Sequence, residues 1–199
     1  MAISATNSTR IYPRDYSGSS SYYYTITASF TETSYSEANN TSTISLSGSF
    51  ACHNASFDKY INFRLYWHDD KTNTDNLVAS YDKWDPYDEG GAAANPSKSL
   101  SGTYTATHKD DGSLNGYAKF YYTLNDPSSS NQNSWTPNPP YGSVSTSTTP
   151  LTPLATGKIY LKLSDGWKNG QTYVKTGKNT WSKAKAVYIK TSDGWKQAK

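Results

Sequence analysis

The sequence predicts an all-β protein, and two observations carry that fold class. First, polar and apolar residues alternate with a period of two along several segments, which is typical of strands with one buried face. Second, aromatic residues take the place of aliphatic ones: the 199 residues include 18 Tyr and 6 Trp but only 7 Ile, 10 Leu and 4 Val. Tyr, Trp and Thr favour a pleated surface over a helix.

The aromatic residues also argue against disorder. A low aliphatic content indicates a disordered chain only when the net charge is high, and here the net charge is +3. Each large ring can bury roughly 150–250 Å². We therefore expect a core built from rings on strands, with Ser and Thr facing water.

Seven strands are expected along the first three quarters of the chain. The strongest alternation places Ile61, Phe63, Leu65 and Trp67 on one face. The expected strands cover residues 22–30, 44–50, 60–68, 77–81, 99–108, 116–124 and 142–148. The pair Asp111-Gly112 predicts a hairpin between the fifth and sixth strands, because Gly takes the positive φ of a tight turn. About seven antiparallel strands with polar turns are typical of an immunoglobulin-like β-sandwich, with a jelly roll as the alternative.

Composition divides the chain into four parts. Residues 1–21 are rich in Ser, Thr and Asn and predict an N-terminal arm or a loose first strand. Residues 22–149 form the expected sandwich, 150–157 a semi-extended linker, and 158–199 a small β-hairpin repeat module. Two long polar loops, 82–98 and 126–141, interrupt the strands, and loops of this length are usually functional or mobile.

The C-terminal module repeats one short unit three times. Its tryptophans, Trp167, Trp181 and Trp195, are 14 residues apart. A short fixed period indicates tandem units, none of which could bury a core alone. The repeated aromatic and basic positions are the candidate binding residues: Tyr160, Lys162, Trp167, Lys168, Tyr173, Lys175, Trp181, Tyr188, Lys190, Trp195 and Lys196. Alternatively, the rings form the core of each unit and the lysines only solubilise it.

Charge separates the two parts of the chain. Residues 1–155 carry 9 Lys/Arg against 14 Asp/Glu, a net of −5, whereas residues 156–199 carry 10 Lys against 2 Asp, a net of +8. Opposite signs favour two modules with different partners. Lysines beside aromatic rings suit an anionic polymer. We do not expect nucleic acid to be that polymer, because the chain has no RNA- or DNA-binding motif.

The sequence offers little catalytic chemistry. It has no nucleophile elbow, phosphate-binding loop, zinc spacing or separated carboxylate pair, so we expect no enzyme, no cofactor and no metal site. His53, His68 and His108 lie on separate expected strands and are interpreted as structural. The acidic stretches at 69–75 and 82–89 lack the ligand pattern of an EF-hand and are expected to be solvated.

Cys52 is the single cysteine, so we expect a buried small hydrophobe and no disulfide. The first residues have neither a basic region nor an apolar run, which predicts no signal peptide and synthesis in a cytoplasm. No segment approaches the roughly 20 apolar residues of a membrane span.

Two segments carry a resemblance. The stretch Asn39-Asn40-Thr41-Ser42-Thr43-Ile44-Ser45-Leu46 and the stretch Ser101-Gly102-Thr103-Tyr104-Thr105-Ala106-Thr107-His108-Lys109-Asp110-Asp111-Gly112-Ser113 resemble an uncharacterised family of siphovirus structural proteins from phages of Gram-positive hosts. The terminal Tyr-x-Lys and Gly-Trp-Lys units look like the tails of phage minor structural proteins. The resemblance implies an immunoglobulin-like module on the virion, with a binding or assembly role and no enzymatic residues.

The expected function is therefore a phage virion accessory protein on the tail, neck or capsid, in multiple symmetric copies beside other virion proteins. Its basic repeats would face anionic cell-wall polysaccharide, giving a role in host adhesion, or would pack on a neighbouring subunit. The alternative is a free carbohydrate-binding module in which Trp84 and Trp135, one in each long loop, are stacking platforms for sugar rings.

Overall fold

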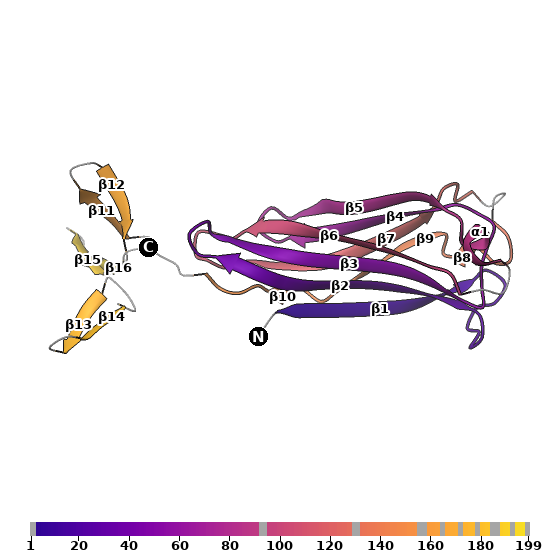
Figure 1. Ribbon diagram of the computed structural model, residues 1–199, viewed down its shortest axis with the longest axis horizontal. Coiled ribbons are helices and arrows are strands. Elements are labelled where there is room, and N and C mark those ends of the chain that lie inside the picture. Colours follow the sequence, from indigo (N-terminus) through magenta and orange to yellow (C-terminus); the bar gives the residue numbers. More distant parts are fainter. Residues whose placement is uncertain are drawn as a thin grey trace.

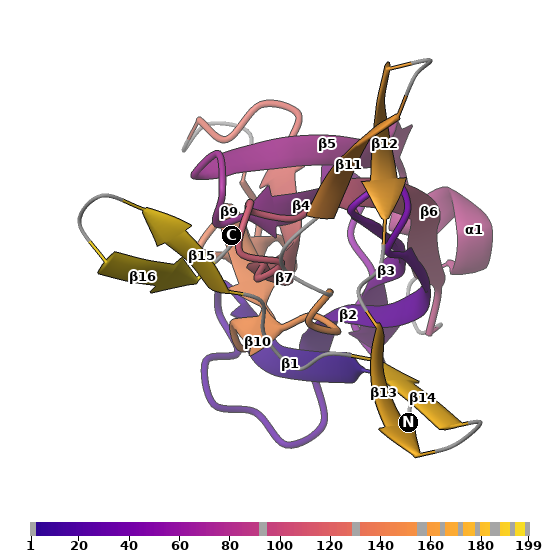
Figure 2. The same ribbon diagram turned by 90° about the vertical axis from the view of Figure 1, so that its left-hand side faces the viewer.

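The protein is all β, with two antiparallel sheets packed face to face (Figures 1 and 2). The computed structural model describes residues 3–91, 95–128 and 132–154, and the backbone of six short strands between residues 159 and 197. The elements of the sandwich are β1 Ser4–Pro13, β2 Tyr23–Ser36, β3 Thr41–His53, β4 Ile61–Asp69, β5 Thr74–Trp84, α1 Pro86–Gly90, β6 Ser97–Thr107, β7 Asn115–Leu124, β8 Pro137–Asn138, β9 Tyr141–Ser145 and β10 Thr149–Pro150.

The strand order is immunoglobulin-like. One sheet has the order β6-β3-β2-β1-β8, and the other has the order β10-β7-β4-β5, with β9 also paired to β7. The chain crosses between sheets from β3 to β4, from β5 to β6, from β6 to β7, and again on entering and leaving the short strand β8. Strands β2, β3 and β6 correspond to A, B and E of an immunoglobulin domain, and β5, β4, β7 and β9 correspond to C′, C, F and G. In the described part of the β5–β6 connection, α1 stands where a constant-type domain has strand D.

All seven expected strands are present, but the expected hairpin between β6 and β7 is wrong. The turn itself forms, with Gly112 at φ 77° and its N–H donating to the Lys109 carbonyl at 2.9 Å. However, β6 pairs with β3 and β7 pairs with β4, in opposite sheets. An Asp-Gly turn reverses the chain locally, and the pairing partners then decide which sheet the next strand joins.

Of the two alternatives for residues 1–21, an arm or a loose first strand, the strand is the one that forms, and it belongs to the sandwich. Strand β1 pairs with β2 from Ser4 opposite Thr31 to Ile11 opposite Tyr24. Its Ser, Thr and Asn side chains conceal the strand in the sequence, since β1 lies toward the edge of its sheet and is mostly exposed. Ladder hydrogen bonds, which any residue except Pro can make on both sides, hold it in place.

The expected linker begins later than residue 150. Leu151 and Leu154 are buried against the sandwich, and their N–H groups donate to the carbonyls of Leu114 and Gly112 at 2.9 and 3.0 Å. The segment follows β10, which pairs with the start of β7. Residues 150–154 therefore belong to the sandwich, and the chain leaves it at the end where β6 and β7 are connected. We call this end the exit end.

Aromatic rings fill the space between the sheets, as the composition indicated. Phe50 lies at the centre, with ring centroids 5.3 Å from Tyr24, 5.7 Å from Phe63 and 5.5 Å from Tyr122. Such tilted and edge-to-face pairs contribute about 0.5–1.5 kcal/mol each beyond the area they bury. The rings leave no room for a side chain at Gly48, where a Cβ would lie 2.2 Å from the Phe120 ring.

Cys52 is buried in the same core, and burial raises the pKa of its thiol. This confirms that it is a small hydrophobic residue of the core rather than a reactive thiol.

A buried polar network ties the exit end together. The Ser42 hydroxyl donates to Glu32 Oε1 at 2.6 Å and lies 2.7 Å from His108 Nε2, while His108 Nδ1 lies 2.9 Å from the Gly112 carbonyl. Glu32 also accepts from the backbone N–H of Thr152, at 3.1 Å to Oε2, and from the Thr152 hydroxyl. These contacts connect β2 and β3 with the β6–β7 connection and with the segment after β10.

The network joins the segment 39–46 to the segment around His108. Ser42 belongs to the first segment and His108 to the second, and Asn40 Nδ2 of the first donates to the His108 carbonyl at 3.1 Å. The two segments are therefore neighbours in space and hold the β6–β7 connection against the β2–β3 connection. Their role in the structure is therefore to stabilise the exit end of the sandwich.

Removing the carboxylate at the centre of this network should destabilise the sandwich. We expect Glu32→Ala to lower the free energy of unfolding by about 2–3 kcal/mol, because Ser42 and Thr152 lose a charged acceptor in a buried site. Glu37→Ala is the matched control, since Glu37 is exposed and should change stability by less than about 0.5 kcal/mol. Urea unfolding of the two variants measures the difference, and equal effects would contradict the assignment.

Candidate functional site

The C-terminal repeats form three separate β-hairpins. Each is a two-stranded antiparallel sheet. The strands are β11 Ile159–Leu163 with β12 Gly166–Gly170, β13 Tyr173–Gly177 with β14 Thr180–Lys183, and β15 Tyr188–Thr191 with β16 Gly194–Gln197. The 14-residue spacing of the tryptophans thus corresponds to one hairpin per repeat, as the sequence predicted.

From the tyrosine to the lysine of each Tyr-x-Lys unit the three hairpins share one register, which places a lysine directly opposite each tryptophan. The second hairpin differs beyond this pair, where its register shifts between Lys175 and Gly177. The opposed pairs are Lys162 with Trp167, Lys175 with Trp181, and Lys190 with Trp195. The first residue of each Tyr-x-Lys unit is opposite the residue two positions after the tryptophan: Tyr160 with Asn169, Tyr173 with Lys183, and Tyr188 with Gln197.

This register assigns the repeated positions to faces. Directly opposed residues of an antiparallel pair lie on the same face, as do residues two apart on one strand. Positions 160, 162 and 167 therefore share a face, whereas Lys168 is opposite Leu161 on the other one. The third hairpin repeats this division, with Lys196 opposite Ile189. The side chains of all these candidate residues lie outside the described part of the structure, so their contacts stay predictions.

Trp84 is not a stacking platform, which corrects the expectation for this residue. Its side chain is only 2% exposed and its ring centroid lies 5.6 Å from Phe63 and 6.0 Å from Phe50. Trp84 is the last residue of β5 and belongs to the core, so neither face of its ring is open to a sugar. The loop prediction was wrong because β5 continues three residues beyond its expected end at Tyr81.

Trp135 is half-buried in an aromatic cluster. Its ring stacks on Tyr16 with centroids 4.4 Å apart and meets Tyr22 edge-on at 5.3 Å, while its carbonyl accepts from the Tyr24 hydroxyl. The ring therefore fastens the loop between β7 and β9 to the loop between β1 and β2. Since Tyr16 covers one ring face, Trp135 is a poor candidate for a stacking platform.

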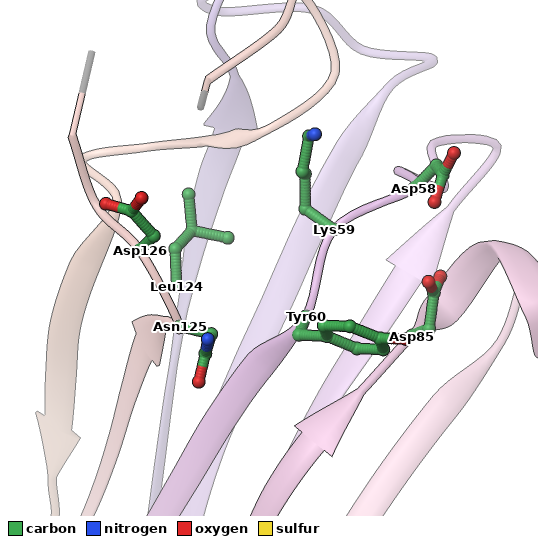
Figure 3. A pocket seen from close by; sticks show the side chains of 7 residues that line it. All are labelled: Asp58, Lys59, Tyr60, Asp85, Leu124, Asn125 and Asp126. Atoms are coloured by element: carbon green, nitrogen blue, oxygen red, sulfur yellow. The ribbon is translucent and has the colours of Figure 1, made fainter. Parts of the chain in front are cut away.

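The described residues contain a polar pocket, to which Asp85 at the start of α1 contributes. Helix α1 lies at the end of the sandwich opposite the exit end (Figure 1). We call this end the loop end, because the β3–β4, β5–β6 and β7–β9 connections meet there. The pocket has a volume of about 220 Å³. Its lining residues are Asp58, Lys59, Tyr60, Asp85, Leu124, Asn125 and Asp126 (Figure 3).

Tyr60 is the aromatic element of this pocket. Its side chain is 48% exposed, and the ring lies at the base of the hollow between the side chains of Asn125 and Asp85 (Figure 3). Backbone and side-chain hydrogen bonds fix this base: the Asn125 N–H donates to the Tyr60 carbonyl at 2.9 Å, and Asn62 Nδ2 donates to Asn125 Oδ1 at 3.3 Å.

The pocket has an acidic character. Asp85 caps the short helix α1, accepting the N–H groups of Tyr87 and Asp88 at 2.9 and 3.4 Å. The pKa of the Asp85 carboxyl is raised above its ordinary value, chiefly because the carboxyl is partly buried. The two N–H groups lower this pKa, whereas the negative charges of Asp88 and Asp58 raise it further. The pocket thus concentrates negative charge around an exposed ring.

The histidines have structural roles. His53 stacks on Tyr23 with centroids 4.2 Å apart, and His68 Nδ1 pairs with Asp75 at 2.9 Å. The group of Glu32, Ser42 and His108 contains the residue types of a hydrolase triad but not its order, since the serine hydroxyl donates to the carboxylate instead of to the histidine. All three side chains are buried, so a substrate could not reach the hydroxyl.

Within residues 3–91, 95–128 and 132–154, no three His, Cys, Asp or Glu side chains come together as metal ligands. The acidic stretch 69–75, expected to be solvated, makes internal ion pairs: Asp70 pairs with Lys109 at 2.6 Å, and Asp75 with Lys119 at 2.8 Å. No helix in the described residues has the length and apolar character to cross a membrane.

Fold and site together define a class of protein: an immunoglobulin-like sandwich with a polar pocket at one end, followed by three lysine- and tryptophan-bearing hairpins. Comparison with protein-family models, with curated proteins and with solved structures gives no match to this chain. The resemblance to siphovirus structural proteins therefore stays a prediction.

Sequence reasoning missed the pocket as a site. It expected a strand over residues 60–68, and Tyr60 is indeed exposed, but it lies just before β4, which begins at Ile61. However, the pocket joins residues from three connections that are far apart in the chain. The only signal was indirect, namely that immunoglobulin-like sandwiches gather their loops at two ends.

Burial of Trp84 predicts a structural rather than a binding phenotype. We expect Trp84→Ala to lower the free energy of unfolding by about 3–5 kcal/mol, because it opens a cavity among the rings of the core. Trp135→Ala should cost less, since Trp135 is half-buried in a surface cluster. Guanidinium unfolding checks both variants, and an unchanged stability of Trp84→Ala would contradict the core assignment.

Proposed function

We propose that this protein is a non-enzymatic component of a bacteriophage particle, carried on the tail, neck or capsid, whose C-terminal hairpins bind anionic polysaccharide of the host cell wall. The observation that carries the binding part is the common register of the three hairpins, which opposes a lysine to a tryptophan in each one. The phage part is supported by the resemblance of two sandwich segments and of the repeats.

The repeated register favours binding over mere solubility. Lysines that only solubilise a hairpin can stand at any exposed position, whereas here the lysine opposite the tryptophan recurs in all three units. A lysine beside an aromatic ring offers a point charge for a phosphate or carboxylate and an apolar ring for the adjoining sugar or polyol. An anionic cell-wall polymer presents both groups in alternation.

Three units on one chain also suit a polymer. Each hairpin would bind weakly, because a surface ion pair contributes only about 0.2–1 kcal/mol. Three linked sites convert later contacts into intramolecular ones and raise the overall avidity without any new contact type. Multiple copies on a particle would multiply this effect.

The charge distribution supports a division of labour between the modules. Residues 156–199 carry a net charge of +8 and residues 1–155 a net of −5. A polyanion is attracted to the first part and repelled by the second, so the hairpins would hold the polymer while the sandwich is free to dock on other virion proteins.

The second candidate is a free carbohydrate-binding module. Neither loop tryptophan supports it in the way the sequence suggested, since Trp84 is buried and Trp135 is covered by Tyr16. The exposed Tyr60 ring in the loop-end pocket favours it instead. The two candidates differ in location, since only a virion protein travels with the particle.

Mass spectrometry of purified particles tests the location. We expect peptides of this chain in a fixed copy ratio to the major capsid protein, unchanged after a high-salt wash and a density gradient, because an assembled subunit has a defined number of sites. Absence of the protein from the particles, together with its presence as a free protein in the lysate, would leave the free carbohydrate-binding module as the better account.

Charge variants on opposite faces of the hairpins test the binding site. We expect Lys162→Gln with Lys190→Gln to weaken adsorption to purified host cell walls by about tenfold at low salt, since two ion pairs of about 0.7 kcal/mol are lost. Lys168→Gln with Lys196→Gln is the matched control: it removes the same charge from the positions opposite Leu161 and Ile189. A pull-down across a salt series measures both.

Equal losses in the two double variants would show that net charge, and not the tryptophan-bearing face, drives adsorption. If adsorption is unchanged while particles fail to assemble, the hairpins contact a neighbouring subunit and the adhesion proposal is wrong.

A further inference from the structure

We propose that the loop-end pocket binds one neutral sugar unit, with the exposed ring of Tyr60 as the surface on which the sugar stacks. This goes beyond the function proposed for the hairpins, whose anionic ligand plays no part in it, and it gives the second candidate, a carbohydrate-binding module, a site and a ligand class. The pocket lies on the sandwich, at the end opposite the one where residue 154 is anchored by its hydrogen bond to Gly112.

The position of the pocket in the fold supports a binding role. Asp58, Lys59 and Tyr60 come from the β3–β4 connection, Asp85 follows β5, and Asn125 follows β7. These connections correspond to the B–C loop, the segment after C′ and the F–G loop. In variable immunoglobulin domains the loops at these positions form the antigen-binding end. This correspondence concerns the architecture alone, so the class of ligand has to be inferred from the chemistry of the pocket.

The chemistry suits a sugar ring. Tyr60 offers an exposed aromatic face that attracts the C–H groups on one side of a pyranose, while its backbone is fixed by the N–H of Asn125. Around this face stand Asp58 and Asp85, which accept hydrogen bonds, and Lys59, which donates them (Figure 3). Sugar hydroxyls both donate and accept, so a ring of mixed polar groups around an aromatic base matches them.

The volume of the pocket and the charge of its lining restrict the range of possible ligands. A volume of about 220 Å³ equals roughly seven waters at 30 Å³ each and is smaller than the roughly 300–1,000 Å³ of pockets for drug-sized ligands. One sugar ring is of this order. The lining carries Asp58, Asp85 and Asp126 against Lys59, which disfavours a uronate or a phosphorylated sugar. A single metal ion is disfavoured too, since no three acidic side chains among the described residues converge as ligands.

Nuclear magnetic resonance of the full chain tests the proposal. Glucose, galactose, rhamnose and N-acetylglucosamine are titrated separately while the backbone amide shifts are followed, with glucuronate and Ca²⁺ as charged probes. We expect saturable shifts at Tyr60, Asn125 and Asp85 with at least one neutral sugar, and weaker binding of glucuronate.

Three variants locate the stacking surface. Tyr60→Ala should weaken binding of that sugar by about tenfold or more, whereas Tyr60→Phe should retain it within about threefold, because the ring face is kept. Tyr87→Ala is the matched control, since Tyr87 is 45% exposed near the pocket but does not line it, and it should bind as the unchanged chain does. Well-dispersed amide spectra confirm that each variant is folded.

The proposal is overturned if no neutral sugar gives saturable shifts at the pocket, or if glucuronate binds as tightly as the neutral sugars. It is likewise overturned if Ca²⁺ alone saturates the same amides, or if Tyr60→Ala binds as the unchanged chain does. None of these results bears on adsorption by the hairpins, which is measured on the anionic cell wall.

Discussion

The packing of aromatic rings between two sheets is the constraint on which the rest of the sandwich depends. A chain with so few aliphatic residues can bury enough apolar area only by placing Tyr, Trp and Phe on the inward positions of its strands. Phe50 contacts rings from both sheets, and Gly48 lets Phe120 approach the backbone of β3. Ring packing thereby fixes the separation of the sheets and, with it, the positions of the connections at both ends.

The two ends of the sandwich have different roles. At the exit end, a carboxylate, a hydroxyl and an imidazole are buried together and hold residues 151–154 against the β6–β7 connection. At the loop end, polar residues from three connections surround a pocket that stays open to solvent. One end is specialised for fixing the chain before the hairpins begin, and the other presents groups that a ligand can reach. This polarity gives the sandwich two separate attachment points.

Period-two alternation identified most clearly the strands with one face in the core, namely β2, β3, β4 and β7. It missed β1, whose Ser, Thr and Asn side chains are exposed and whose pairing depends on backbone groups that all residues share. It also misassigned the connection after β6, since the Asp111-Gly112 turn says nothing about which sheet follows. The three hairpins followed from the repeat, whereas the Tyr60 pocket requires three distant connections to meet and had no local signal. Trp84 shows the same limit, because its burial depends on where β5 ends.

The central claim is that folding belongs to residues 1–154 and polyanion binding to the hairpins that follow. The most direct test compares the whole chain with a chain that ends at Leu154, measuring thermal unfolding by circular dichroism and salt-dependent binding to purified cell walls on the same samples. The account predicts a cooperative transition with a midpoint close to that of the whole chain, together with loss of salt-sensitive binding. A shortened chain that fails to fold cooperatively, or that still binds in a salt-sensitive way, would contradict it.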